Sequence, residues 1–258
     1  MTWKKRKLTV LLILILVLLA NSYGAQVQIQ GGQASVSASR YSHFLRGINL
    51  PYWFWLNQGK VQPLEKRFSS ADLNLIKELG LTFVRIPVDM ANIYDPQRKD
   101  KLNPVALQIL LSGIEKILKS GLAVNFDLHS ISQEADGSNY SGPLGQDEKF
   151  TAEFINFWQR LAEKLAIFDP DRMLIEPMNE PVFLGEEYKW PPIQKELLQA
   201  IRKILPEHTL LATGAFWSNL PGLLALEPVD DPNVWYNFHF YEPHIFTHQG
   251  ATWGEGYE

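Results

Sequence analysis

Apolar and polar positions follow two alternating rhythms along the chain from about residue 43. Short apolar stretches, rich in β-branched and aromatic residues, are each followed by a loop and then by a longer segment with helical spacing. The predicted strands occupy residues 44–49, 82–88, 122–128, 173–177, 209–212 and 234–240. Strands that alternate with helices in this way predict a parallel sheet with right-handed crossovers.

The predicted helices between these strands carry signals at their ends. Ser69 and Asp72 have the spacing of a capping box, and Asn103 is an N-cap followed by Pro104 at the first helical position. Gly80 and Gly121 stand where C-terminal glycines are expected. Two more helices are predicted at about 147–167 and 192–205, and the connection 213–233 is predicted to hold only a short helix.

Candidate functional residues follow several strands, which favours a closed (β/α)8 TIM barrel over an open doubly wound sheet with one switch point. No glycine-rich phosphate loop follows the first strand, which argues against nucleotide binding. Only six strands fit before residue 240, whereas a complete barrel has eight. The sequence therefore predicts an α/β barrel truncated after its sixth strand, and we expect such a chain to fold poorly and to lack activity.

The first 25 residues have the order of an export signal. A basic start at residues 4–7 precedes an apolar run at 8–20, and small residues follow. The run is shorter than the roughly 20 residues of a spanning helix, although an uncleaved signal anchor stays open. Residues 26–42 are interpreted as a linker or lid, and residues 43–258 as the barrel domain. We expect a secreted or periplasmic protein that leaves the membrane once the signal is cleaved.

Composition narrows the function classes further. Hydrophobic residues make up 46% of the chain and charged residues 20%, which is typical of a globular domain. The net charge of −4 is spread without a long run of one sign, so neither a nucleic-acid footprint nor a disordered charged tail is indicated. The chain has no cysteine, so the exported fold does not rely on disulfides.

Glu180 is the strongest candidate for catalysis. The apolar fourth strand runs directly into Asn179, Glu180 and Pro181, so Glu180 lies where a barrel strand delivers side chains to the cleft. Pro181 restricts the backbone of Glu180, and Asn179 can hydrogen-bond a sugar hydroxyl. Glycosidases need a carboxylic acid that stays protonated near neutral pH, which a desolvating cleft can supply. The alternative is an ordinary acidic loop residue.

Other polar residues lie at or near strand ends. Arg85 interrupts an apolar strand, where a cation needs a partner. It is either part of a structural ion pair or a donor that orients a carboxylate at the top of the barrel and keeps it ionised. Glu176 has the parity of Glu180 but lies one layer deeper, so it is interpreted as the partner of a cation. Asp127 and His129 share a face of the third strand; a histidine there can be structural or catalytic.

The sixth strand ends in a histidine-rich segment. His239 and Tyr241 share parity at its end, and His244 and His248 follow at helical spacing. A metal site made by the three histidines is an alternative, but no carboxylate-rich surroundings or HExxH motif support it. Trp217 follows the fifth strand, and Trp53 and Trp55 follow the first. Each can stack on a sugar ring or simply pack beneath a loop.

Five motifs occur in an order that resembles glycoside hydrolase family 5, the cellulase family. They are Arg-Gly-Ile-Asn (46–49), Val-Arg-Ile-Pro (84–87), Asp-Leu-His (127–129), Asn-Glu-Pro (179–181) and His-Phe-Tyr-Glu-Pro (239–243). The resemblance implies that Glu180 is the general acid/base. It also implies that the residues around the sugar at the cleavage point are Arg85, His129, Asn179, His239 and Tyr241.

The resemblance further implies a nucleophilic glutamate on a seventh strand and a stacking tryptophan on an eighth, neither of which falls within this chain. Glu255 and Glu258 follow the sixth strand too closely to be that nucleophile. We therefore expect retaining, endoglucanase-like hydrolysis of a β-linked polysaccharide or oligosaccharide by a monomer, without metal or organic cofactor. The alternatives are a catalytically inactive, glycan-binding barrel fragment and a metal-dependent hydrolase.

Overall fold

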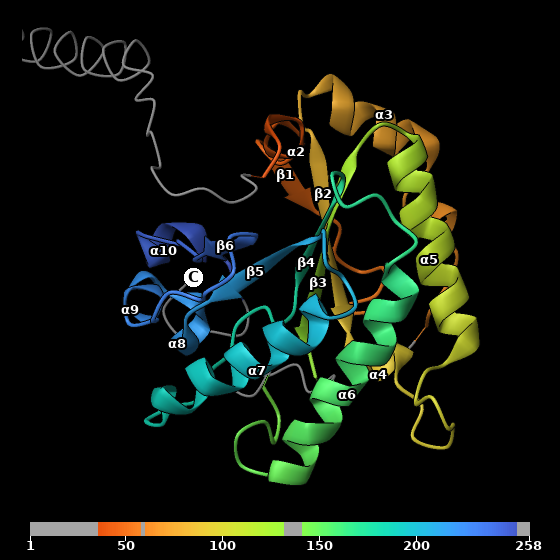
Figure 1. The fold of residues 1–258 in the computed structure, drawn as a ribbon. Coiled ribbons are helices and arrows are strands. Elements are labelled where there is room, and N and C mark those ends of the chain that lie inside the picture. The colour runs from red at the N-terminus through yellow and green to blue at the C-terminus, as the bar shows by residue number, and fades with distance from the viewer. Residues whose placement is uncertain (1–35, 58–59, 132–140, 252–258) are drawn as a thin grey trace, which may run out of the picture. The chain divides into compact units, whose positions relative to one another are not determined.

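A computed structural model describes residues 36–57, 60–131 and 141–251, so the predicted signal at 1–25 and both Glu255 and Glu258 lie outside the described residues. The described strands form one parallel sheet in the consecutive order β1 to β6 (Figure 1). They are β1 (Gly47–Asn49), β2 (Phe83–Asp89), β3 (Ala123–Ser130), β4 (Met173–Glu176), β5 (Thr209–Thr213) and β6 (Val234–Asn237). This order has no reversal point, as expected for a barrel rather than a doubly wound sheet.

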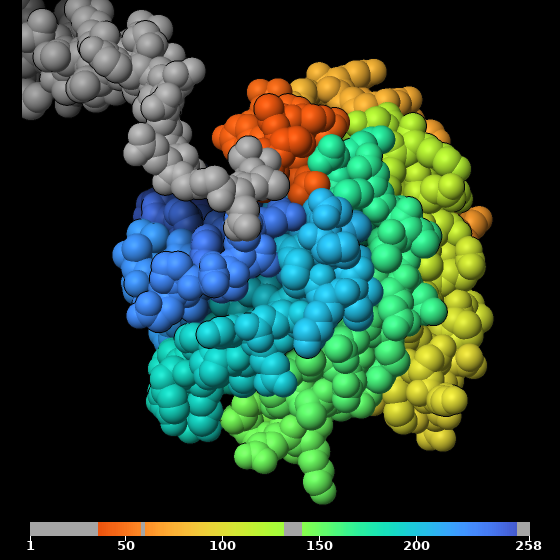
Figure 2. All heavy atoms as spheres, viewed as in Figure 1, coloured from red at the N-terminus to blue at the C-terminus, as the bar shows by residue number. Residues whose placement is uncertain are grey.

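Helices separate the strands along the chain. Those of eight or more residues are α3 (Ser70–Glu78), α5 (Pro104–Lys119), α6 (Glu148–Leu165) and α7 (Trp190–Arg202). The shorter ones are α2 (Ala38–His43), η1 (Leu64–Lys66), α4 (Met90–Ile93), η2 (Glu187–Lys189), α8 (Ala215–Ser218), α9 (Leu220–Leu224) and α10 (His244–Thr247). Figures 1 and 2 show α5, α6 and α7 following one another around the outside of the sheet. Among the described helices, none is both long and apolar enough to cross a membrane.

The predicted helix signals are confirmed. Ser69 and Asp72 form a reciprocal capping box, which satisfies two backbone amides at the start of α3. Asn103 accepts hydrogen bonds from two amides at the start of α5, with Pro104 at the first helical position. Gly80 and Gly121 adopt positive φ angles of 76° and 100°, which glycine tolerates best after a helix.

The core is centred on β3, whose eight residues are all buried between the barrel interior and the helices. Trp53 belongs to this core, so its predicted alternative as a sugar-stacking residue is wrong. Its side chain is fully buried and its Nε1 donates to the Gln62 carbonyl oxygen at 2.9 Å. The indole fits because α5 carries Gly113 there; a Cβ on that glycine would lie 2.3 Å from the ring.

The start of the described fold differs from the predicted linker or lid at 26–42. Residues 38–43 form helix α2, and its Arg40 is buried. Arg40 Nε donates to Asp171 at 2.9 Å, while Nη1 donates to the Glu207 carbonyl oxygen at 2.7 Å and to Asn233 Oδ1 at 3.2 Å. A buried guanidinium with several acceptors fastens α2 to the turns before β4, β5 and β6. Residues 38–42 are therefore part of the barrel structure.

Two strands are shorter than predicted. β1 starts at Gly47 rather than at residue 44, because Phe44 caps the end of α2. β6 ends at Asn237 rather than at residue 240. The backbone amide of His239 leaves the sheet and donates to the Ser218 carbonyl oxygen at 2.8 Å. The connection 213–233 holds two short helices, α8 and α9, where one was predicted.

Candidate active site

Arg85 on β2 is the centre of a buried polar network inside the barrel. Its Nε and Nη2 donate to the two oxygens of Glu176 on β4, each at 2.8 Å, which is a bidentate pair. Nη2 also lies 2.7 Å from Asn179 Oδ1 and 3.0 Å from Asp127 Oδ2. Asn237 on β6 donates to Glu176 at 3.2 Å. Glu176 is thus the buried partner of a cation, as its parity predicted.

Asp127 and His129 meet on the same face of β3, as predicted. His129 Nδ1 lies 2.6 Å from Asp127 Oδ2, and its Nε2 lies 3.4 Å from the amide nitrogen of Asn179. With a proton on Nδ1, the ring donates to Asp127 and accepts from Asn179, so this tautomer satisfies both contacts. His129 therefore orients Asn179 from one side while Arg85 orients it from the other.

Burial and charge set the ionisation of this network. Burial disfavours the charged guanidinium, but Asp127 and Glu176 outweigh it and raise the pKa of Arg85. Burial also raises the pKa of Asp127, against the opposing effect of Arg85. For Glu176 the Arg85 charge and hydrogen bonds overcome burial and lower its pKa. Burial, together with the Arg85 charge, lowers the pKa of His129 to about 3, so its imidazole is neutral at physiological pH.

Glu180 lies at the end of β4 with His239 as its hydrogen-bond partner. His239 Nδ1 is 2.5 Å from Glu180 Oε1, and both side chains keep less than a fifth of their surface exposed, at 18% and 17%. Tyr241 follows two residues later and is half exposed. Burial, and next the Glu180 charge, raise the pKa of Tyr241, which indicates that its phenol lies near the carboxylate. The structure thus brings Glu180, His239 and Tyr241 together.

The tryptophan candidates lie on two sides of the site. The Trp55 ring lies against His129 with a centroid separation of 4.1 Å and an interplanar angle of 51°. Trp217 is partly buried after β5 and has a left-handed backbone with φ of 55°. Its amide donates to the carbonyl oxygen of Pro181 at 3.2 Å, so its segment is attached to the loop that carries Glu180.

The three histidines considered for a metal do not form a common site. His239 faces Glu180, whereas the rings of His244 and His248 stack on each other with centroids 3.7 Å apart. Within residues 36–57, 60–131 and 141–251, no group of three or more His, Cys, Asp or Glu is arranged to hold a metal ion.

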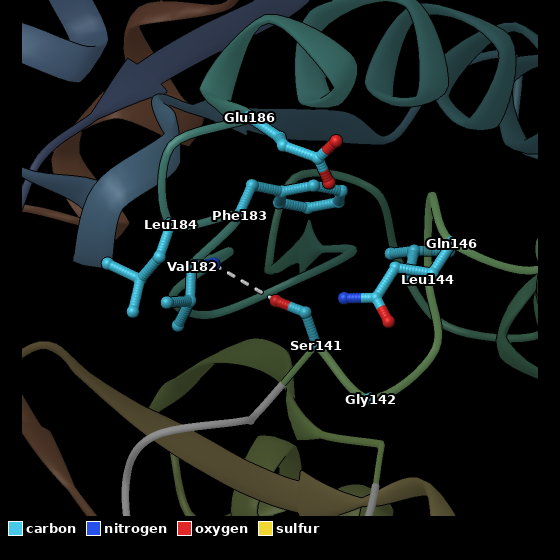
Figure 3. Close-up of a pocket in the computed structure, with 8 residues that line it drawn as sticks. All are labelled: Ser141, Gly142, Leu144, Gln146, Val182, Phe183, Leu184 and Glu186. Carbon is cyan, nitrogen blue, oxygen red and sulfur yellow. Dashed lines mark hydrogen bonds between the residues drawn. The ribbon is translucent and has the colours of Figure 1, made fainter.

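A cavity of about 260 Å³ lies beside the loop that follows Glu180. Figure 3 shows Glu186 and Phe183 on one side of it and Gln146 on the other, with the Val182 amide donating to Ser141 Oγ at 3.0 Å. The remaining lining residues are Gly142, Leu144 and Leu184. None of the predicted site residues lines this cavity, so it is separate from the group around Glu180.

Sequence reasoning missed several residues that support the site. Asp89 and Ser130, at the ends of β2 and β3, form a buried hydrogen bond to each other. Asn125 donates to Glu176 at 2.8 Å, and Ser218 Oγ donates to the Asn179 carbonyl oxygen at 2.6 Å. Asn125 could have been found, because it shares the inward parity of Asp127 on the same strand.

The fold and the site together define a (β/α)-barrel protein with a carboxylate-based site at the carboxyl ends of its strands, where barrel enzymes carry their chemistry. The chain belongs to the cellulase family, glycosyl hydrolase family 5, whose family model matches residues 36–257. This confirms the family resemblance and the barrel class predicted from the motifs.

Curated relatives agree with this assignment. The chain is 28% identical over 215 residues to endoglucanase C of Acetivibrio thermocellus, covering 82% of this chain and 62% of the relative. It is 29% identical over 217 residues to cellodextrinase A of Ruminococcus flavefaciens, covering 81% and 62%. The chain therefore spans about three fifths of the length of these relatives.

Solved structures show the same architecture. Cel5A of Thermotoga maritima in complex with mannotriose aligns with a TM-score of 0.70 at 27% identity, covering 84% of this chain and 67% of that chain. The same enzyme has also been solved in complex with cellobiose, and it aligns with the same score and coverage.

Proposed function

We propose that the protein is a retaining glycoside hydrolase that cleaves β-linked glucan chains, with Glu180 as the general acid/base. The observation that carries this proposal is the position of Glu180. It stands at the carboxyl end of β4, in hydrogen-bond contact with His239 and beside the Arg85 network. The endoglucanase and cellodextrinase relatives support a glucan as substrate, and the Cel5A complexes support oligosaccharide binding at this kind of site.

In the proposed reaction Glu180 protonates the oxygen of the leaving sugar, and later accepts a proton from the attacking water. Asn179, oriented by both Arg85 and His129, is suited to hydrogen-bond a hydroxyl of the sugar being cleaved. Tyr241 and Trp217 are proposed to line the same cleft and contact the substrate. His239 fixes the carboxyl group of Glu180 for proton transfer.

A retaining mechanism needs a second carboxylate about 5–5.5 Å from the first. Glu176 and Asp127 are unsuited to this role, because both are buried and paired with Arg85. We therefore propose that the nucleophile lies outside the described residues. Neither of the two proton transfers proposed for Glu180 requires a metal or an organic cofactor.

The test is incubation of the complete protein, in a form that includes the strand with the proposed nucleophile, with a soluble β-1,4-glucan. Reducing sugar is measured, and ¹H NMR identifies the first-formed anomer. We expect sugar release with the β anomer appearing first, and loss of release in Glu180→Gln. The matched control is Glu187→Gln, which changes a partly buried glutamate seven residues further along the chain. Binding of the glucan without any release would favour the alternative of an inactive glycan-binding barrel, and a first-formed α anomer would contradict retention.

We also propose that the protein is a monomer and that it is exported through the basic and apolar segment at 1–25. Mass spectrometry of the mature N-terminus tests the export, with a start between residues 21 and 26 expected in the extracytoplasmic fraction. Recovery of intact residues 1–25 in membranes would support the signal anchor instead.

A further inference from the structure

Three consecutive residues after β5 have left-handed backbone conformations. The φ angles are 61° for Phe216, 55° for Trp217 and 55° for Ser218. Residues with a Cβ rarely adopt this conformation even singly, so a run of three persists only where surrounding contacts hold it. Such strained backbone is concentrated at functional sites, which makes the contacts of this tripeptide informative.

The tripeptide is hydrogen-bonded to the loop that carries Glu180. The Phe216 amide donates to the Val182 carbonyl oxygen at 3.3 Å, and the Trp217 amide donates to that of Pro181 at 3.2 Å. Ser218 Oγ donates to the Asn179 carbonyl oxygen at 2.6 Å. The backbone is therefore held on both sides of Glu180.

The same tripeptide also holds the partner of Glu180. The Ser218 carbonyl oxygen accepts the His239 amide at 2.8 Å, which is the contact that turns the chain out of β6. Ser218 is fully buried. One residue is therefore bonded through its hydroxyl to the residue before Glu180, and through its carbonyl to His239.

The local sequence explains how this conformation is built. Gly214 and Gly222 pass so close that a Cβ on Gly214 would lie 2.1 Å from the backbone of Gly222. Asn219 then caps α9 by accepting the Gly222 amide at 2.8 Å. The contact between the two glycines and the Asn219 cap fold residues 214–222 into a short loop. The tripeptide lies in this loop and contacts the segments that follow β4 and β6.

We infer that Ser218 is a positioning residue that sets the contact between Glu180 and His239. Its hydroxyl fixes the peptide preceding Glu180, and its carbonyl fixes the start of the segment carrying His239. Both Glu180 and His239 are therefore positioned by hydrogen bonds to the same residue. The inference rests on the proposed function for its effect on catalysis, whereas its effect on the Glu180–His239 contact can be measured without activity.

The experiment uses the full protein with Ser218→Ala and Ser218→Gly. Both remove the hydroxyl, and glycine in addition accepts the left-handed backbone, so Ser218→Gly retains the fold even if alanine does not. We expect kcat on a β-glucan to fall about tenfold, with KM within about twofold, because substrate contacts remain while the acid/base is displaced. We also expect the ring ¹⁵N resonances of His239, assigned with His239→Gln, to shift in both variants.

Ser120→Ala is the control, because Ser120 Oγ likewise donates to a backbone carbonyl oxygen, that of Ile117 at 2.7 Å, at the end of α5. It should leave kcat and the His239 resonances unchanged. Should the parent protein release no sugar, the proposed function fails, but the resonances still decide the inference. Unshifted His239 resonances in folded Ser218→Gly would overturn it, whatever happens to kcat.

Discussion

The two sides of the site are built in different ways. On the β2–β4 side, Arg85, Asp127 and Glu176 are held by side-chain hydrogen bonds across three strands, and both carboxylates are almost completely buried. On the β4–β6 side, Glu180 and His239 are partly exposed, and their positions depend on backbone contacts made by a loop. The Arg85 group is fixed by charge pairing in the core, whereas Glu180 and His239 are fixed by hydrogen bonds to the backbone segments that carry them.

Because of this difference, we expect the two sides of the site to contribute differently to the stability of the fold and to catalysis. A buried charge network is costly to break, because each charge left without a partner pays its full desolvation penalty. A partly exposed pair contributes little to folding, since water can replace either partner. We therefore expect changes on the Arg85 side to affect unfolding first, and changes on the Glu180 side to affect turnover first.

The largest expected effect on the Arg85 side comes from Arg85→Leu. Removing the cation leaves the buried carboxyl groups of Glu176 and Asp127 without a positively charged partner, so the free energy of unfolding should fall by about 3–5 kcal/mol. Denaturant unfolding measures this change. The control is Arg98→Leu, which breaks the exposed pair with Asp100 and should change stability by less than about 1 kcal/mol. Equal effects of the two variants would contradict the buried-network description.

His239→Ala tests the opposite side. Loss of a hydrogen bond to a carboxylate is typically about 1.5–3 kcal/mol, so kcat/KM on a β-glucan should fall by about 10–100-fold. The midpoint of unfolding should change little, because the side chain is at the partly exposed end of β6. His43→Ala, at the end of α2, is the control for histidine removal. A large loss of stability with intact turnover would reverse the comparison.

Asp89 adds a pH-dependent test of the buried side. Burial raises its pKa from 3.8 to about 6, although hydrogen bonds from Ser130 and the Leu56 amide oppose this. The folded protein then binds a proton between about pH 4 and pH 6 that the unfolded chain does not, so stability falls as pH rises through this window.

Comparison with Asp89→Asn isolates this group from other titrations. The unfolding free energy of the parent, taken relative to the variant, should rise by about 1–2 kcal/mol when the pH falls from about 7 to about 4.5. Denaturant unfolding at several pH values gives this difference. A constant difference across the window would show that Asp89 titrates at its ordinary pKa.

Much of the fold was predictable because its signals are local. The capping box of Ser69 and Asp72, and the Asn103 cap with Pro104, fix helix starts within a few residues of sequence. Strand parity correctly placed Glu176 with a cation and Asp127 beside His129. These predictions need only the spacing of residues along one element.

The remaining features depend on residues that are far apart in sequence. Burial of Trp53 requires the space left by Gly113. The attachment of α2 to the barrel requires hydrogen-bond acceptors more than 130 residues from Arg40. The early end of β6 depends on the Ser218 carbonyl oxygen, which accepts the His239 amide. The direction of this carbonyl follows from a left-handed backbone that no sequence pattern predicts. No pattern within one segment contains this information.

The most direct test of the account is the dependence of Glu180→Gln on the leaving group. A general acid contributes about 10²–10⁴-fold where the leaving oxygen needs a proton, and far less where it does not. We predict a loss of that size in kcat/KM on a natural β-glucan, and a much smaller loss in the first step with an activated aryl glycoside. Equal losses on both substrates, or full activity on the glucan, would contradict the role of Glu180 as the acid/base.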